Sequence, residues 1–240
     1  MKYLIAILLL RQAYVNKKRR RIYLFLTVLL FSLPLISTIF YQTFYGEKNY
    51  NIKKSPVTKL KIIPIEEKTK QSYTIGKYTI SYEAQAEIDL CARAVYIDFN
   101  NGIFSSWDYY SNPVYDTISP VDLSVFIGSM GEDWKNYRIK HERRAMFVYG
   151  DVKVGEWENL HIIPATKNIY AGLKTVRVGD IISLKGYLIN WQGTGQYNYL
   201  KTETALSFIT ESKEKLGGRF TWLCMQFFAT ELEVRGYVYK

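Results

Sequence analysis

The stretch Ile22–Tyr41, IYLFLTVLLFSLPLISTIFY, decides how this chain is organised, because it contains no charged residue. As a helix rising about 1.5 Å per residue it would be roughly 30 Å long, which is the thickness of the hydrocarbon core of a bilayer. Its few hydroxyl side chains do not gather on one face, as they would on a surface helix of a soluble domain. The sequence therefore predicts a single-pass transmembrane helix here.

The residues that flank this stretch predict its orientation. Residues 1–21 carry seven positive side chains and no acidic one, whereas the first charges after the stretch, Glu47 and Lys48, cancel. Positively charged flanks stay in the cytoplasm. We therefore expect a cytoplasmic N-terminus, a single span in the cell inner membrane, and a periplasmic or extracellular C-terminal part.

The apolar run Tyr3–Leu10 would reach only about 12 Å as a helix, which is too short to span a membrane. One interpretation places it along the inner leaflet, with the basic residues at 17–21 bound to anionic headgroups. The other is a tail that only sets the topology. The sequence is compatible with both interpretations.

The formal charge of +10 suggests nucleic-acid binding until its distribution is considered. Residues 1–21 and 42–72 are strongly basic, but residues 73–240 carry a formal charge of only −1. The high pI thus follows from membrane topology, and membrane lipid replaces nucleic acid as the expected partner.

Residues 42–72 have the composition of a linker, being rich in Lys and broken by Pro56 and Pro64. The alternative for part of this segment is that Leu60–Ile65 adds an edge strand to the following domain. Residues 73–240 show short β-rich runs between turn residues, which predicts a mainly β, barrel-like outer domain, with an OB-like ring as one form of it. Gly186 inside a strand is typical of the bends that such a ring requires.

Local patterns predict the elements of this domain. A helix is expected to begin at Ser119–Asp122, because Ser can cap it and Pro fits its first turn. The clearest strand is Ile181–Trp191, where apolar residues alternate with polar ones. Further elements are expected as follows: strands at Tyr137–Tyr149, Trp157–Ile163, Tyr197–Ile209 and Thr221–Val234, and a short helix within Ala165–Lys174.

Three stretches, SPVDLSVFIGSM, ENLHIIPA and VRVGDIISLKGYLI, carry a resemblance over most of the outer domain. In them the chain resembles a family of uncharacterised bacterial single-pass membrane-anchored proteins. The resemblance implies an extracytoplasmic setting and no particular activity. It rests on Ser119, Pro120, Asp122, Gly128, Asn159, His161, Pro164, Gly179, Asp180 and Gly186.

Candidate catalytic residues are few. The two histidines, His141 and His161, lack the spacing of a metalloprotease helix, so no metal or other cofactor is expected. One local set, Asp122, Asn159 and His161, could perform acid–base chemistry if the carboxylate orients the imidazole. The competing interpretation is that Asn159 and His161, on one strand face, are ordinary polar residues with satisfied hydrogen bonds.

Two further features leave alternatives open. Cys91 and Cys224 could form a disulfide in an oxidising compartment, or Cys224 could be a buried thiol. Three aromatic residues of an expected loop could bind a protein or a glycan, or pack in the core. They are Trp107, Tyr109 and Tyr110.

The sequence supports two hypotheses of function. In the first, the outer domain is not an enzyme, and binds or scaffolds an envelope component, with a protein of the envelope as the expected partner. In the second, the chain is a membrane-tethered hydrolase that acts on an envelope substrate through His161.

Overall fold

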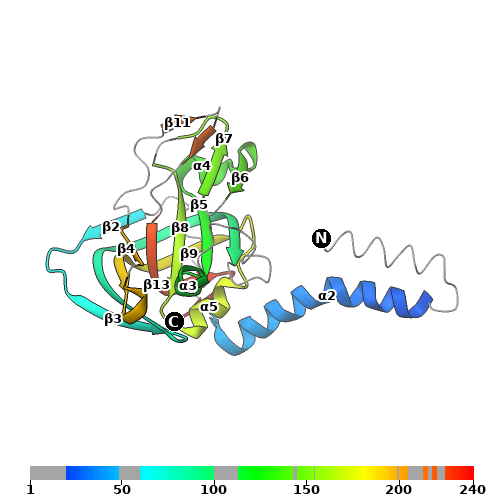
Figure 1. Ribbon diagram of the computed structural model, residues 1–240. Helices are drawn as coiled ribbons and strands as arrows, with labels where there is room; N and C mark the ends of the chain where they lie inside the picture. Colours follow the sequence, from blue (N-terminus) through cyan, green and yellow to red (C-terminus); the bar gives the residue numbers. More distant parts are fainter. Residues whose placement is uncertain are drawn as a thin grey trace.

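The computed structural model describes residues 20–48, 60–99, 113–142, 145–153, 155–198, 200–204, 213–215, 218–220 and 225–240. Within these residues the fold is mainly β, as the sequence predicts, and helix α2 (Arg20–Tyr45) extends away from the β-rich part (Figure 1). No helix of the described residues is long and apolar enough to cross a membrane.

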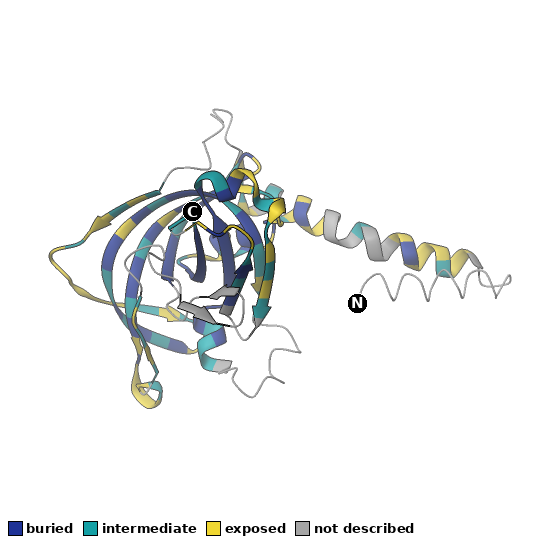
Figure 2. Ribbon diagram, turned by 90° about the horizontal axis from the view of Figure 1, so that it is seen from above, coloured by how far each residue is buried: buried dark blue, intermediate teal, exposed yellow. Residues whose placement is uncertain are grey.

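Five of the described strands pair in a closed ring. They are β4 (Tyr78–Phe99), β5 (Val121–Phe126), β8 (Trp157–Pro164), β13 (Met225–Val234) and β9 (Ile181–Gly193), and β9 pairs with β4 again. The β8–β13 pair is parallel and the other four are antiparallel. Figure 2 shows how these strands curve around a buried interior.

The interior of the ring is apolar because alternate residues of each strand point into it. On β9 the buried positions Ile182, Leu184 and Leu188 alternate with more exposed ones, which confirms the strand predicted at Ile181–Trp191. Val121, Leu123 and Val125 of β5 belong to the same core. The long strand β4 can follow the ring because its pairings shift register twice, between Ala84 and Ala86 and between Ala94 and Tyr96.

Gly186 lies where β9 meets β13 most closely. A Cβ atom at this position would be 2.0 Å from the carbonyl oxygen of Phe228. The pairing of β13 with β9 shifts register next to this point, between Ala229 and Glu231. The residue left out of the pairing, Thr230, is on β13, so the irregularity beside Gly186 belongs to the partner strand and not to β9.

Additional strands extend the main sheet or form a second one. The main sheet also contains β1 (Glu47–Lys48), β2 (Leu60–Pro64), β3 (Lys70–Ile75), β10 (Lys201–Thr202) and β14 (Tyr237–Tyr239). The second sheet contains β6 (Arg138–Glu142), β7 (Ala145–Tyr149), β11 (Lys213–Lys215) and β12 (Gly218–Phe220). The remaining elements are α3 (Pro113–Ile118), α4 (Gly128–Glu132), η3 (Trp134–Asn136), α5 (Lys167–Leu173) and η4 (Gly195–Tyr197).

The prediction that a helix begins at Ser119–Asp122 is wrong. Helix α3 ends at Ile118, and strand β5 begins at Val121. Ser119 does not cap a helix here, because it is fully buried and its hydroxyl donates to the carbonyl of Ile162, at 3.4 Å. The alternation of Val121, Leu123 and Val125 allows β5 to pair with both β4 and β8, and this pairing outweighs a local capping pattern.

The other predicted elements are confirmed in full or in part. Strand β8 and helix α5 confirm the predictions at Trp157–Ile163 and Ala165–Lys174. The strand expected at Tyr137–Tyr149 is instead a hairpin of β6 and β7, preceded by η3. Strand β13 lies within the predicted Thr221–Val234, and β10 lies within the predicted Tyr197–Ile209, of which residues 199 and 205–209 are outside the described residues.

The segment predicted as a linker, residues 42–72, differs from a free tether. Its part Leu60–Pro64 is strand β2, which pairs with β4 and confirms the edge-strand alternative. Glu47 and Lys48 form β1 and pair with β14 at the end of the chain. Residues 42–72 have the composition expected of a linker, but strands β1 and β2 within them are joined to the sheet by main-chain hydrogen bonds.

Candidate functional site

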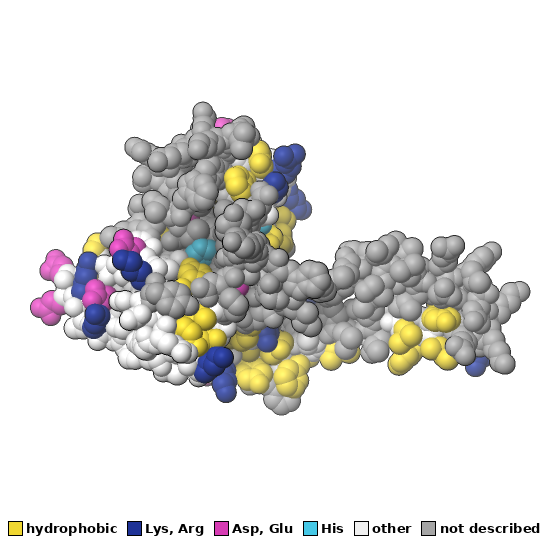
Figure 3. Space-filling model, in the orientation of Figure 1, with side chains coloured by type: hydrophobic (Ala, Val, Ile, Leu, Met, Phe, Trp, Pro, Cys, Tyr) yellow, Lys and Arg dark blue, Asp and Glu magenta, His cyan; other side chains and the backbone are white. Residues whose placement is uncertain are grey.

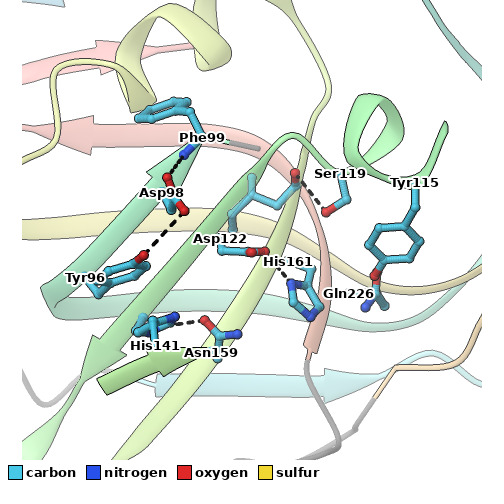
Figure 4. A network of polar contacts seen from close by, with 12 residues as sticks. Tyr96, Asp98, Phe99, Tyr115, Ser119, Asp122, His141, Asn159, His161 and Gln226 are labelled. Atoms are coloured by element: carbon cyan, nitrogen blue, oxygen red, sulfur yellow. Dashed lines mark hydrogen bonds and ion pairs between the residues drawn. The ribbon is translucent and has the colours of Figure 1, made fainter. Parts of the chain in front are cut away.

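A row of polar residues crosses four strands of the ring. In the register of the sheet, Asp98 of β4 pairs with Asp122 of β5, which pairs with His161 of β8. His161 pairs in turn with Gln226 of β13. Residues opposite each other in neighbouring strands lie on the same face of a sheet, so these side chains share the outer face of the ring (Figure 4).

At the centre of this row His161 and Asp122 are in direct contact. Nδ1 of His161 is 2.5 Å from Oδ1 of Asp122, and the two side chains are only 7% and 3% exposed. A pair taken out of water in this way is held by its short hydrogen bond. The sequence-predicted association of these two residues is therefore present in the fold.

A second row lies beside the first and contains Asn159, the third residue of the predicted set. Tyr96 of β4 pairs with Ser124 of β5, which pairs with Asn159 of β8. The Ser124 hydroxyl donates to Oδ1 of Asn159 at 2.9 Å and lies 2.7 Å from Nε2 of His141. A hydroxyl carries one proton, so in this arrangement Nε2 of His141 is the donor to Ser124.

His141 comes from the second sheet and covers the second row. Its ring stacks on that of Tyr96, with 3.5 Å between centroids and 8° between planes. Burial lowers the pKa of His141 from 6.5 to about 4, although the nearby Asp122 carboxylate acts in the opposite direction. Burial and the Asp98 carboxylate raise the pKa of Tyr96 to about 12. Both rings are therefore neutral at pH 7.

The lowered pKa of His141 predicts that the fold loses stability in mild acid. In the unfolded chain this histidine takes up a proton below about pH 6.5, whereas the folded protein resists protonation until about pH 4. The free energy of unfolding should therefore fall as pH drops from 6.5 to 4, by roughly 2 kcal/mol for a ring that is only partly buried. Urea unfolding of the full chain between pH 4 and 8 measures this slope.

The variant His141→Gln is the matched control, because it keeps a side-chain amide near Ser124 and does not titrate. Subtracting its pH profile removes the contribution of the carboxylates, which titrate in the same range. Parallel profiles for the variant and the wild type would contradict the assignment to His141.

Aromatic side chains enclose the other end of the first row. The hydroxyl of Tyr115, on α3, donates to Oε1 of Gln226 at 3.0 Å, and the indole N–H of Trp191 donates to the same oxygen at 3.3 Å. The Tyr115 ring also meets that of His161 edge to face, at 6.2 Å. Tyr115 and Trp191 therefore enclose this end of the first row.

This arrangement limits the chemistry that the cluster can perform. Ser124 is fully buried, and its proton is directed to Asn159, so the Ser124–His141 pair is not arranged as a nucleophile and its base. His161 with Asp122 has the geometry of an oriented imidazole. No group of three potential metal ligands occurs among the residues that the structure describes.

The remaining sequence-predicted positions are distributed elsewhere. Cys91 is buried in β4, while Cys224 lies outside the described residues, so their disulfide stays a prediction. Trp107, Tyr109 and Tyr110, and the run Tyr3–Leu10, also lie outside the described residues.

Sequence reasoning missed Ser124, His141, Tyr96 and Gln226. For Ser124 a signal was available, because in Val121–Phe126 the polar residues Asp122 and Ser124 alternate with apolar ones, as on a strand with one polar face. The others join the cluster only through pairings of distant strands.

The comparisons with known proteins give no match. No protein-family model matches the chain, and neither does any curated protein or solved structure.

Proposed function

We propose that this chain is an anchored binding protein: Ile22–Tyr41 spans the bacterial inner membrane, and the β-rich domain outside binds an envelope component. The observation that carries the binding part is the accessible edge of the polar and aromatic cluster, where Asp98 is exposed and Tyr96 is half-buried. The sequence pattern around α2 carries the anchoring part.

The described part of α2 supports the anchor. Its apolar side chains face solvent on several sides, with Phe25 64% and Val28 65% exposed, and they form apolar patches along the helix (Figure 3). A soluble protein rarely leaves such a surface uncovered. The seven cations of residues 1–21, with no acidic residue among them, favour a cytoplasmic start.

The strand order supports an OB-like, barrel-like form for the ring. The first three strands of the ring are consecutive neighbours, the third pairs with the fifth, and the fourth closes the ring against the first. Helix α5 lies between the third and fourth strands. In OB-folds the ligand binds on the face of the second and third strands, which here are β5 and β8.

The charge and chemistry of this face indicate what it would bind. The exposed carboxylate of this face is that of Asp98, and its negative charge disfavours a polyanion such as nucleic acid. A carboxylate beside a tyrosine ring, as at Asp98 and Tyr96, suits a glycan or a polypeptide of the envelope. We therefore propose a neutral or basic envelope component, with an envelope protein as the first candidate.

Photo-crosslinking in intact cells tests the binding proposal. A benzophenone amino acid in place of Tyr96 should give adducts with an envelope component, identified by mass spectrometry. The same residue in place of Glu66, in the connection between β2 and β3, serves as the control. Recovery of no adduct at Tyr96, or equal adducts at both sites, would contradict the proposed face.

The contact between His161 and Asp122 favours a second candidate, a membrane-tethered hydrolase in which His161 performs acid–base catalysis. Purified full-length protein should then hydrolyse envelope glycan or lipid, and His161→Gln should reduce turnover by at least about a hundredfold at unchanged folding. A binding protein shows no turnover in either form.

The topology gives a separate prediction. Alkaline phosphatase fused after Lys240 should be active, because the C-terminus is expected outside the cytoplasm. Replacing Lys17–Arg21 by neutral residues should reduce that activity severalfold, since Lys2 and Arg11 then remain as the only positive residues before the span. The paired readout is a reporter that is fluorescent only in the cytoplasm. High fluorescence of the unmodified fusion would overturn the orientation.

A further inference from the structure

The end of α2 is fixed to the domain at α5 and at the sheet edge. Nη2 of Arg177 donates to Oγ1 of Thr38 at 3.1 Å, and Nζ of Lys174 donates to the hydroxyl of Tyr41 at 3.4 Å. Glu47, two residues beyond the end of the helix, pairs with Val238 of β14. The helix therefore sets the position of the domain, and no free tether separates the two.

The surface beside this junction is basic and partly apolar. Lys174 and Arg177 are exposed, and Val178 next to them is 52% exposed. The ammonium of Lys174 lies 4.5 Å from the Tyr170 ring centroid and 5.3 Å from that of Tyr41. We call Lys174, Arg177 and Val178 the α5 surface.

The Asp180 carboxylate does not neutralise the side chains of Lys174 and Arg177. The Asp180 carboxylate forms an ion pair with Arg235 at 2.7 Å and accepts a hydrogen bond from the backbone N–H of Arg177. The guanidinium of Arg177 carries five N–H donors, and its contact with Thr38 uses one. The α5 surface therefore offers cationic donors to an anionic group.

The contact points on α2 fix the depth of this surface. Thr38 lies three residues before Tyr41, which is about 4.5 Å nearer to the centre of the bilayer if the helix spans it. Because Ile22–Tyr41 covers only the hydrocarbon core, the Arg177 side chain that reaches Thr38 lies at the outer boundary of that core, directly beneath the lipid headgroups of the outer leaflet. Phe40, Tyr41 and Tyr45, at the same end of α2, have the residue types of an interfacial aromatic belt.

We infer that the α5 surface rests on the outer leaflet, where Lys174 and Arg177 bind lipid phosphate groups and Val178 enters the interfacial layer. This inference rests on the proposed membrane anchor and adds a fixed orientation of the domain to it. The partner is the phosphodiester headgroup of a phospholipid, recognised by charge-assisted hydrogen bonds.

Photo-crosslinking of the full chain in phospholipid nanodiscs tests the contact. A benzophenone amino acid at position 178 should form lipid adducts at least fivefold more often than one at Glu66. Glu66 is the matched control because the β2–β3 connection lies on the side of the domain away from α2 (Figure 1). Ile181, which is 42% exposed, is a second probe position should the first variant fold poorly.

Charge reversal tests the headgroup contact itself. The double variant Lys174→Glu/Arg177→Glu should reduce lipid adducts at position 178 at least threefold, most strongly in nanodiscs containing anionic lipid. Equal adducts at 178 and 66, or none at 178 and 181, would overturn the inference. If that result came with an active alkaline phosphatase fusion, the anchor would stand and only the orientation would be wrong.

Discussion

Gly186→Ala should destabilise the domain by about 3 kcal/mol, because overpacking against the main chain cannot be relieved by a side-chain rotation. The added Cβ would lie 2.0 Å from the Phe228 carbonyl oxygen and 3.1 Å from the Cα atom of Ala229, so β9 and β13 would have to separate. For a domain of this size the melting temperature should fall by roughly 10 °C. Thermal unfolding of the full chain in detergent, followed by circular dichroism, measures it.

Gly76→Ala separates this clash from the general cost of replacing a glycine. Gly76 has a φ of +58°, but a Cβ there meets no atom within 4 Å. Its replacement should cost only about 1 kcal/mol, from backbone strain alone. A Gly186→Ala protein that melts within a few degrees of the Gly76→Ala protein would show that the ring closes less tightly than described.

Asp122→Ala should cost about 3 kcal/mol, since it leaves His161 buried without its carboxylate partner. The substitution removes the 2.5 Å hydrogen bond between Oδ1 of Asp122 and Nδ1 of His161. Asp122→Asn keeps an oxygen that can accept from Nδ1–H, so its cost should be about 1 kcal/mol. Urea unfolding at pH 7.5 compares the two variants with the wild type.

A double-mutant cycle identifies the source of this destabilisation. If the interaction is direct, Asp122→Ala and His161→Ala together should destabilise less than the sum of the single variants, by about 2 kcal/mol. Additive effects would place the cost of Asp122→Ala in poorer packing instead of in the pair. The cycle therefore also tests whether Asp122 orients the imidazole of His161.

Parts of the fold follow from local sequence patterns. Apolar and polar residues alternate in Ile181–Trp191, and this local pattern predicts β9 because a strand with one buried face has an apolar residue at every second position. The same alternation is present in Val121–Phe126, but the Ser-Pro pair before it favours a helix start. A barrel-like form could be predicted from composition, but the pairs that close the ring, such as Ile80 with Gly193, could not, because they are far apart in the chain.

The candidate site was predictable only in part for the same reason. His161 and Asn159 share a strand face by their spacing, and the sequence offers Asp122 as a carboxylate to orient the imidazole. What places Asp122 against His161, however, is the register of β5 with β8. His141 reaches Ser124 from a separate sheet, and no sequence spacing encodes that contact.

Ring closure also has a consequence for how the protein is made. The strand that completes the ring, β13, follows β4, β5, β8 and β9 in the chain, and β14 after it pairs with β1 beside α2. Until β13 is made, the edges of β8 and β9 that it covers lack this partner, and such edges are prone to aggregate. Pairing of such distant segments is slow. A chaperone that shields β8 and β9 until β13 has been made would speed maturation, and a chain truncated before Met225 would be degraded instead of folding.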